Sequence, residues 1–520
     1  MTTNSPTVCI LTAGIGSRMG PFASIINKSL LPIYDKGIIS HIINCFPQNT
    51  NFVIALGYKG EQVKNYLELM HSEINFKFIK VDNFDGNGSG PAYSLMCCKS
   101  ELQKPFFFVA SDGFYKKIPL NFDFDWLGIS ESESHQKDYC NIGFETKTKI
   151  VSEVFDKLTP PKIKDLEFKP FNGLMFIKNF KLFWDALDLK NEKNEQQISL
   201  GFKKLIENRF LKIVNLAWMD LGSFDKYNKN LGLEFDFSKT NEFIYFSDKK
   251  IVKFFHDSSI ALKRVQKARL NPKVFPQNIV YKDQFFSYDK VEGDIVYKNI
   301  NLLAFQNLLK WLLKNLWISK KVNNKKFQQI CEDFYIKKTH ERVALFKNKY
   351  PNFKDTRKVN GVEVIPIDDL LKIIPKSISQ GIPVFMHGDL HFDNMITKNN
   401  IQFSLIDWRQ DFAGKIEYGD WYYDLAKLYG GIHMNYDYIK NGLMNYQENE
   451  DNIWLDYAIR KSFNELSTVL ENFIISQGLD LNKVKLIQGI IYLNMSPLHH
   501  PPFDKLLFSL SQKILSEQLK

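Results

Sequence analysis

The first 112 residues alternate between short apolar segments and segments with helical spacing, and this alternation constrains the fold more than any other feature. Residues 7–14, 51–58, 76–82 and 105–112 are short apolar runs, which predict buried strands. The segments between them, such as 60–70, repeat apolar residues at helical spacing. Strands and helices in alternation predict a parallel-rich, Rossmann-like α/β sheet with helices on both faces. Ligands of such sheets bind at the carboxyl ends of the strands.

A change of pattern divides the chain in two. The stretch 231–240 separates the first region from a new strand-rich start, in which residues 241–257 have the pattern of a hairpin. From about residue 301 the pattern becomes helical. We therefore predict two domains, residues 1–236 and 237–520, the second with a small strand-rich lobe at about 241–300 and a helical lobe at about 301–520.

Composition excludes several classes of protein. Hydrophobic residues make up 44% of the 520 residues and charged residues 24%, which argues against a disordered or fibrous chain. The 68 Lys and Arg exceed the 58 Asp and Glu, so the net charge is +10. No basic block dominates one segment, so this charge suits anionic small molecules and does not by itself indicate nucleic acid.

The cysteines and the apolar segments bear on the compartment. The six cysteines are scattered and form no C-x-x-C pair, which indicates free thiols in a reducing environment. No run of 18 apolar residues occurs, so we expect no membrane insertion. The N-terminus lacks the charged and apolar regions of a signal peptide. We therefore expect a cytoplasmic protein that acts on small molecules, and the sequence leaves its oligomeric state open.

The loop after the first strand combines glycines with a cation. Residues 11–19 read L-T-A-G-I-G-S-R-M, where Gly14 and Gly16 let the backbone approach a ligand closely and Arg18 adds a forked cation for phosphates. The loop has neither the P-loop pattern nor the G-x-G-x-x-G dinucleotide pattern. Lys28, in K-S-L-L-P-I, follows at close range. The loop and Lys28 together indicate a triphosphate site.

Three further segments extend this candidate site. A second glycine-rich loop, G-N-G-S-G-P, occupies residues 86–91. Asp112 ends the fourth apolar run, and Asp220 lies in W-M-D-L-G-S. A carboxylate at a strand end above a phosphate site suits magnesium, which prefers oxygen ligands.

These segments as a set resemble the nucleotidyltransferases that make NDP-sugars and CDP-choline, over about residues 7–232. The resemblance implies attack by a substrate phosphate on the α-phosphorus of an NTP, with pyrophosphate leaving. Many relatives have Pro before the signature Lys, where this chain has Asn27. By the resemblance, the triphosphate is held by Gly14, Gly16 and Arg18, the developing charge is stabilised by Lys28, magnesium is held by Asp112 and Asp220, and the base pocket is lined by Gly88 and Gly90.

A second set of polar residues lies in the C-terminal half. Residues 385–396 read F-M-H-G-D-L-H-F-D-N-M-I, and I-D-W follows at 406–408. Phosphoryl transfer needs a carboxylate to orient a hydroxyl nucleophile and metal ligands near the γ-phosphate. Asp389, Asn394 and Asp407 have the residue types and the order for these roles.

This second set resembles the aminoglycoside phosphotransferase and choline kinase group, a branch of the protein-kinase-like fold, over about residues 241–520. The resemblance implies that Asp389 is the catalytic base and that Asn394 and Asp407 hold magnesium. It also implies that Lys253, on a predicted strand, pairs the ATP phosphates. The Glu expected on the following helix is not evident in residues 258–270.

Four neighbouring residues have other expected roles. We expect Asp420 and Asp424, at an acidic helix start, to shape the site rather than to perform chemistry. We expect structural roles for His387 and His391.

The two resemblances together predict a bifunctional enzyme. Its kinase half would use ATP and Mg²⁺ to phosphorylate a small sugar, polyol or amino alcohol. Its transferase half would join that phosphate to a second NTP, with CTP or UTP favoured, to give an activated precursor for surface polysaccharide. One alternative is a choline or ethanolamine kinase with a CTP:phosphocholine-type cytidylyltransferase. The other is a nucleotidyltransferase with an inactive, regulatory kinase-like domain.

Two local features bear on the acceptor. The sequence I-D-W-R-Q-D lacks the Glu expected after Trp in bacterial choline kinases, and Asn172-Gly173 resembles a sugar-contacting turn. Both favour a sugar or polyol. An amine would want an aromatic cage, for which the candidates, more readily explained by packing, are Trp408, Trp421, Tyr422 and Tyr423.

Overall fold

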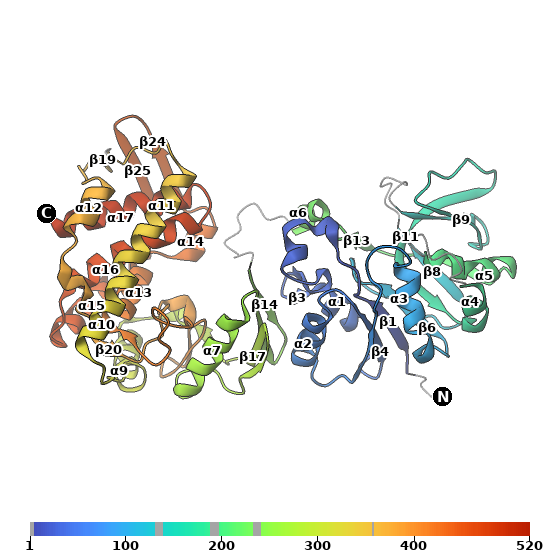
Figure 1. The fold of residues 1–520 in the computed structure, drawn as a ribbon, viewed down its shortest axis with the longest axis horizontal. Coiled ribbons are helices and arrows are strands. Elements are labelled where there is room, and N and C mark those ends of the chain that lie inside the picture. The colour runs from blue at the N-terminus through green and yellow to red at the C-terminus, as the bar shows by residue number, and fades with distance from the viewer. Residues whose placement is uncertain (1–4, 131–138, 188–196, 232–240, 356–357) are drawn as a thin grey trace. The chain divides into compact units, whose positions relative to one another are not determined.

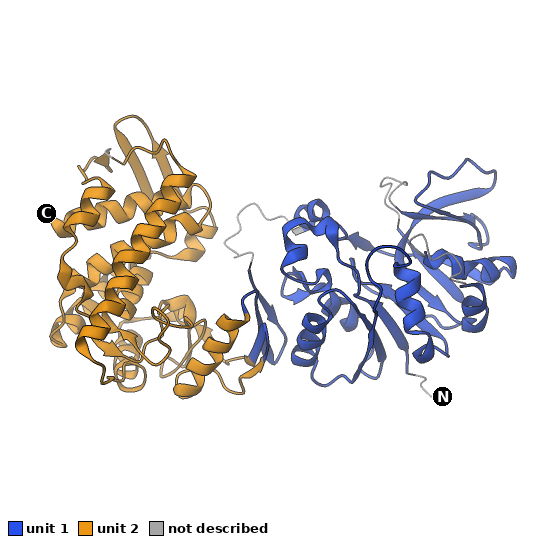
Figure 2. Cartoon of the chain, in the orientation of Figure 1, with its two compact units in different colours: residues 1–234, 238–257, 282–287 blue, residues 235–237, 258–281, 288–520 orange. Residues whose placement is uncertain are grey.

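A computed structural model describes residues 5–130, 139–187, 197–231, 241–355 and 358–520. The chain forms two compact units (Figures 1 and 2). The first unit comprises residues 1–234, 238–257 and 282–287, and the second comprises the rest. The predicted division at 236/237 falls within 232–240, which lies outside the described residues.

The first unit is built on a nine-stranded mixed sheet, with β10-β9-β11-β6-β1-β4-β5 as its main order. The predicted parallel strands are confirmed as β1 (Thr7–Leu11), β4 (Asn51–Leu56), β5 (Phe76–Lys80) and β6 (Phe106–Ala110). The antiparallel part adds β8 (Asp125–Ile129), β9 (Cys140–Glu145), β10 (Val151–Asp156) and β11 (Leu166–Ile177), and β12 (Leu211–Asn215) pairs in parallel with β8.

Both faces of this sheet are buried, as the sequence predicts. Val8 and Ile10 of β1 belong to one hydrophobic cluster, whereas Cys9 between them belongs to another. This alternation reflects the period of two along a strand. The first cluster includes residues of α1 (Ile38–Asn44) and α2 (Gly60–Met70), and the second includes residues of α3 (Pro91–Cys97), α4 (Phe180–Ala186) and α5 (Lys203–Glu207).

A second, four-stranded sheet has the order β14-β15-β17-β16. Its strands are β14 (Glu242–Phe246), β15 (Lys250–Phe255), β16 (Val280–Lys282) and β17 (Phe285–Asp289), so the predicted hairpin is present. β14 and β15 lie wholly in the first unit. Their buried residues, among them Tyr245 and Phe254, join the same cluster as α2. These strands were predicted as part of the small lobe, and one face of them is covered by the first region.

The second unit is mainly helical. Its longer helices are α7 (Ser258–Leu270), α9 (Leu302–Asn315), α10 (Asn324–Glu332), α11 (Lys338–Lys349), α13 (Trp421–His433), α15 (Phe463–Ser476), α16 (Leu481–Met495) and α17 (Phe503–Leu519). The second unit also contains short strands, most of them in the part predicted as the helical lobe, where the pattern analysis did not foresee them. They are β18 (Asp294–Ile295), β19 (Lys358–Val359), β20 (Pro383–Val384), β21 (Met395–Lys398), β22 (Gln402–Leu405), β23 (Gly419–Asp420), β24 (Met444–Glu448) and β25 (Asn452–Tyr457).

Membrane-spanning character is absent from the helices described. None of them is both long enough and apolar enough to cross a bilayer.

Candidate active sites

The two carboxylates predicted in the first region lie together because two short strands pair. β7 (Gly113–Tyr115) is antiparallel to β13 (Trp218–Asp220), with Gly113 opposite Asp220. A Cβ atom at Gly222 would lie 3.0 Å from Asp220 Oδ1, 3.5 Å from Asp112 Oδ2 and 3.4 Å from Arg18 Nη2. Three residues that are far apart in the sequence therefore converge on one glycine.

Lys28 joins this group through a direct contact. Its Nζ lies 2.8 Å from Asp112 Oδ2. Burial alone would raise the pKa of Asp112, but the Lys28 ammonium and the Arg18 guanidinium outweigh it and hold that pKa below its usual value. Gly16 has φ +69°, and a Cβ there would lie 3.2 Å from Lys28 Cδ. The glycine therefore leaves room for the lysine side chain.

Asn27 orders the turn that presents Lys28. Its Oδ1 accepts hydrogen bonds from the backbone N–H of Ser29 (3.0 Å) and from the Ser29 hydroxyl (2.8 Å). Its Nδ2 donates to the carbonyls of Thr12 and Tyr58. The residue that departs from the usual Pro therefore acts as a cap of the short 3₁₀ helix η2 (Lys28–Leu30), a role that a proline could not fill.

A cavity of about 560 Å³ opens beside this cluster. Of the predicted residues, Gly88 and Asp220 are not among those that line it. Gly173 also lines it, beside the predicted turn residue Asn172, at an irregularity in the pairing of β11. The predicted residues that do line the cavity are Gly14, Gly16, Arg18, Lys28, Gly90 and Asp112.

Two residues beside Asp220 were missed by the sequence analysis. Lys226 Nζ lies 2.5 Å from Asp220 Oδ2, and the Tyr139 hydroxyl donates to the same oxygen. Burial would lower the pKa of Lys226, but Asp220 and Tyr139 raise it above its usual value. Lys226 lies on α6 (Phe224–Leu231), which begins directly after the W-M-D-L-G-S segment, so its position was the available signal.

In the second unit, the structure brings the predicted catalytic-loop residues together. Asn394 Nδ2 donates to the backbone carbonyl of Asp389 (2.9 Å) and lies 3.3 Å from its Oδ2. The N–H of Ile406, next to Asp407, donates to the Asn394 carbonyl (2.9 Å). Asp407 itself has φ +57°, a backbone conformation that non-glycine residues rarely adopt and that often marks functional sites.

Lys427 and His391 surround the carboxylate of Asp389. Lys427 Nζ lies 2.8 Å from Asp389 Oδ1, and His391 Nε2 lies 3.7 Å from Asp389 Oδ2. Burial would raise the pKa of Asp389, but Lys427 and His391 hold it well below its usual value. His391 was expected to be structural, and Lys427 was missed. The feature of the sequence that could have indicated Lys427 is its place on α13, three residues after Asp424.

Asp424 and His387 hold the catalytic loop in place. Asp424 accepts from the backbone N–H groups of His387 (2.8 Å) and Gly388 (2.7 Å). His387 Nδ1 accepts from the N–H of Asp389, and its Nε2 donates to the Ile406 carbonyl. Burial lowers the pKa of His387 to about 3, so the ring is neutral in this arrangement. These contacts are of the kind expected for residues that shape the site.

As the sequence indicates, α7 carries no acidic residue, so the Glu expected on this helix is absent from it. Instead, Lys267 of α7 donates to the backbone carbonyls of His387 (3.2 Å) and Arg409 (2.8 Å). Lys253 lies on β15, in the first unit, and is buried. Asp420 caps α13 by accepting from the Tyr422 N–H.

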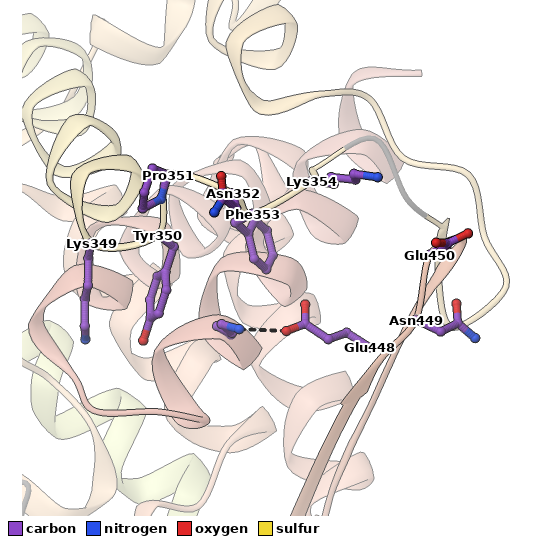
Figure 3. Close-up of a pocket in the computed structure, with 10 residues that line it drawn as sticks. Lys349, Tyr350, Pro351, Asn352, Phe353, Lys354, Glu448, Asn449 and Glu450 are labelled. Carbon is purple, nitrogen blue, oxygen red and sulfur yellow. Dashed lines mark hydrogen bonds and ion pairs between the residues drawn. The ribbon is translucent and has the colours of Figure 1, made fainter.

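The second unit has another cavity, of about 540 Å³, away from these residues (Figure 3). Two of its lining residues, Lys505 and Glu448, form an ion pair (2.6 Å), and a third, Lys349, contacts Asp504 outside the lining (2.6 Å). None of the predicted catalytic residues lines it.

Metal binding can be judged from the donor groups. Among the described residues, no group of three or more His, Cys, Asp and Glu is arranged to hold a metal on its own. Asp112 and Asp220 approach the same glycine and offer carboxylate oxygens, so they fit Mg²⁺ that takes its other ligands from phosphates and water. Asn394 and Asp407 offer oxygens of the same hard type.

Comparison with known proteins supports both halves separately. Residues 347–458 match the phosphotransferase enzyme family. Two relatives, both named bifunctional protein GlmU, come from Methanococcus vannielii and Methanococcus maripaludis. Each is 23% identical to this chain, over 224 and 221 residues, or 41% of this chain. The chain spans about half the length of these curated relatives, 51% and 50%.

Solved structures similar to the first region include two transferases. The CTP:phosphocholine cytidylyltransferase of Streptococcus pneumoniae is 18% identical, with 44% of this chain and 99% of that chain covered and a TM-score of 0.36. The inositol-1-phosphate CTP transferase of T. maritima is 13% identical, with 44% and 94% covered and the same TM-score of 0.36. The predicted pairing of a nucleotidyltransferase-like region with a phosphotransferase-like region is confirmed as a resemblance by the sequence matches in the two halves.

Proposed function

We propose that this chain is a bifunctional enzyme that phosphorylates a small alcohol with ATP and then couples the phosphate to a second NTP. The observation that carries the proposal is the presence of two separate lysine–aspartate sites on one chain. In one, Lys28 pairs with Asp112, and in the other, Lys427 pairs with Asp389. A product of the second site, a phosphate ester, is the kind of substrate that the first would use.

In the first site, cations would hold the triphosphate. Arg18 and Lys28 line the cavity and would stabilise the charge that develops as the ester phosphate attacks the α-phosphorus and pyrophosphate leaves. Gly14 and Gly16 would let backbone amides approach the phosphates, and Gly90 would line the base pocket. Magnesium, held by Asp112 and Asp220, would neutralise phosphate charge.

In the second site, Asp389 would accept the proton of the acceptor hydroxyl. Lys427 keeps that carboxylate ionised and so able to orient the hydroxyl. Lys253 would pair with the ATP phosphates. Asn394 and Asp407 would hold magnesium, which supplies charge neutralisation at the γ-phosphate.

The charges near Asp389 favour a sugar or polyol over an amine as the acceptor. Lys338 Nζ and Arg409 Cζ lie 4.4 Å and 5.2 Å from the centroid of the Phe334 ring. Burial lowers the pKa of Lys338 to about 6, with Arg409, Arg342 and Lys427 contributing. The neighbouring cations that contribute to this shift, Arg409, Arg342 and Lys427, would also repel a cationic acceptor bound beside them. The aromatic residues considered for an amine cage are packed, with Trp408, for example, 4.5 Å from the Phe275 ring.

A coupled assay tests the proposal. The full chain, ATP and Mg²⁺ are combined with each of CTP, UTP, GTP and dTTP and with matched acceptors, namely sugars and polyols against choline and ethanolamine. We expect ADP from a sugar or polyol, followed by pyrophosphate with one NTP. ADP from choline alone would overturn the acceptor assignment. Pyrophosphate from a supplied phosphate ester with no ADP from any acceptor would favour a regulatory kinase-like half, which the absence of Glu on α7 allows.

We also propose a place for the product in a reaction sequence. An NDP-activated sugar or polyol is a donor for glycosyl or polyol-phosphate transfer, so we place the product among precursors of surface polysaccharide. Finding the NDP product unused by membrane fractions that assemble such polymers would count against this placement.

A further inference from the structure

The sheet formed by β14, β15 and β17 buries one face against the turn that carries Lys28 and against α2. Tyr245 of β14 stacks edge-on against Tyr66 of α2, with ring centroids 4.7 Å apart. The ring centroid of Phe285, on β17, lies 6.3 Å from that of Tyr66. Tyr245, Phe254 and Leu30 are all fully buried and belong to one hydrophobic cluster. The contact is therefore a packed core rather than a surface touch.

One hydrogen bond from this sheet reaches the end of the Lys28 turn. The Tyr245 hydroxyl donates to the backbone carbonyl of Leu30 at 2.8 Å. Leu30 is the last residue of η2, the short helix that begins at Lys28. A buried carbonyl that loses its donor is destabilising, so this bond constrains where the turn can lie.

A second connection reaches the beginning of the same turn. Gln62 Oε1 accepts from the backbone N–H of Asn27 (2.9 Å), and Gln62 Nε2 donates to the Ile25 carbonyl (3.1 Å). Gln62 Nε2 also donates to Oε1 of Gln284 (2.8 Å), which precedes β17. Gln284 thus fixes the amide that holds Asn27. Both ends of the Lys28 turn are tied to the sheet that follows the first region.

We propose that Tyr245 and Gln284 are positioning residues for Lys28, so that the sheet carrying Lys253 is also a working part of the transferase site. This inference rests on the proposed transferase function. Tyr245 and Gln284 do not line the cavity, and they act by fixing the backbone on either side of Lys28. Lys28 in turn must lie where charge develops, because such stabilisation depends on preorganised geometry.

The main test compares Tyr245→Phe with Lys282→Met in the full chain. Tyr245→Phe removes only the hydroxyl. Lys282→Met removes an ion pair to Glu68 of α2, which joins the same layers but does not reach the turn. With an NTP and a phosphate ester, Tyr245→Phe should lower kcat for pyrophosphate release about 3- to 10-fold and change KM less than about 2-fold. Lys282→Met should leave kcat unchanged.

A double variant separates positioning from general destabilisation. If Tyr245 acts through Lys28, Lys28→Ala combined with Tyr245→Phe should be no slower than Lys28→Ala alone. Independent, multiplying losses, or equal losses in Tyr245→Phe and Lys282→Met, would overturn the proposal.

Hydrogen exchange provides a readout that needs no activity. The amides of residues 28–31 should exchange faster in Tyr245→Phe and in Gln284→Ala than in Lys282→Met. If the wild-type chain released no pyrophosphate with any NTP, the proposed function would fail while this exchange result would still decide the positioning role. Unchanged exchange in both variants would overturn it.

Discussion

The two candidate sites gather their residues in different ways. In the first, Arg18, Lys28, Asp112 and Asp220 come from two short 3₁₀ helices, a turn and a strand that are spread over most of the first unit. The pairing of β7 with β13 brings the two aspartates together. In the second, Asp389 and Asn394 lie on one loop, and Asp407 follows the hairpin of β21 and β22 that comes directly after it. Lys427 lies on the next long helix, α13. A sheet edge can assemble a site from distant parts of a chain, whereas a loop site is a local sequence motif.

Both sites contain a lysine–aspartate pair, but the charges around the pair differ. Each holds a lysine 2.8 Å from an aspartate. Asp112 is held by Lys28 and Arg18, both suited to bind phosphate. Asp389 is paired with Lys427 and lies close to His391. Burial lowers the pKa of His391, but the Asp389 carboxylate outweighs it and raises that pKa to about 9. The pair in the first site suits charge neutralisation, and the pair in the second keeps a carboxylate ionised.

The largest expected effect tests whether the two sites are independent. Asp389→Asn should lower ADP formation by about 10³-fold or more, because the amide cannot accept the hydroxyl proton. Pyrophosphate release from a supplied ester should stay within about 2-fold, because the lost carboxylate serves only the kinase step. Asp112→Asn should do the reverse. Measuring ADP and pyrophosphate separately for each variant checks this, and a loss of both products in either variant would contradict independence.

The next effect concerns the lysine that the sequence analysis missed. Lys427→Met should lower kcat for ADP formation about 100-fold, because Asp389 loses the cation that lies closest to its carboxylate. Steady-state kinetics of ADP formation measure it. Lys485→Met on the neighbouring α16, which pairs with Glu471 instead, is the control and should retain activity. Equal activity of both variants would remove Lys427 from the site.

A smaller effect tests how closely the first site is packed. Gly222→Ala should lower kcat for pyrophosphate release about 10-fold, because its Cβ would crowd Asp220, Asp112 and Arg18. ADP formation in the same protein is the internal control. A pyrophosphate rate equal to wild type would show that the two carboxylates can move apart without cost.

The smallest effect concerns stability and pH. Burial lowers the pKa of His71, the C-cap of α2, to about 4, and the Lys36 ammonium adds to this. The unfolded chain, near pKa 6.5, therefore binds more protons, so stability is full above about pH 6.5 and falls by about 1.4 kcal/mol per pH unit towards pH 4. Urea unfolding of wild type and His71→Gln at pH 7.5 and 5 should show a smaller pH dependence in the variant. An identical dependence would contradict it.

Much of the fold follows from patterns that the sequence displays directly. Alternation of apolar runs and helical spacing predicted β1, β4, β5 and β6, because a strand buried on both faces must be apolar throughout. The hairpin of β14 and β15 followed from alternating residues around a polar turn. The alternation of apolar and polar residues along a strand does not tell which element packs on its apolar face. The packing of Tyr245 on Tyr66 was therefore not predictable.

The candidate sites were predictable to different degrees for the same reason. Asp389, Asn394 and Asp407 are recognisable as a set because their spacing is local. Lys226, Tyr139 and Lys427 were missed because each reaches its aspartate only through tertiary packing. Asn27 was noted only as a departure from a pattern, and its hydrogen bonds to Thr12 and Tyr58 required the folded neighbours to be known.

The return of β14, β15 and the start of β17 to the first unit has a consequence for synthesis. The main part of that unit ends at residue 234, but its last residues are 282–287. A ribosome adding about 5–20 residues per second needs about 3–10 s to make the roughly 50 residues between. Throughout that interval Tyr66 and Leu30 lack some of the side chains that bury them. The nascent first region therefore presents an apolar surface to chaperones until translation has passed well into the second.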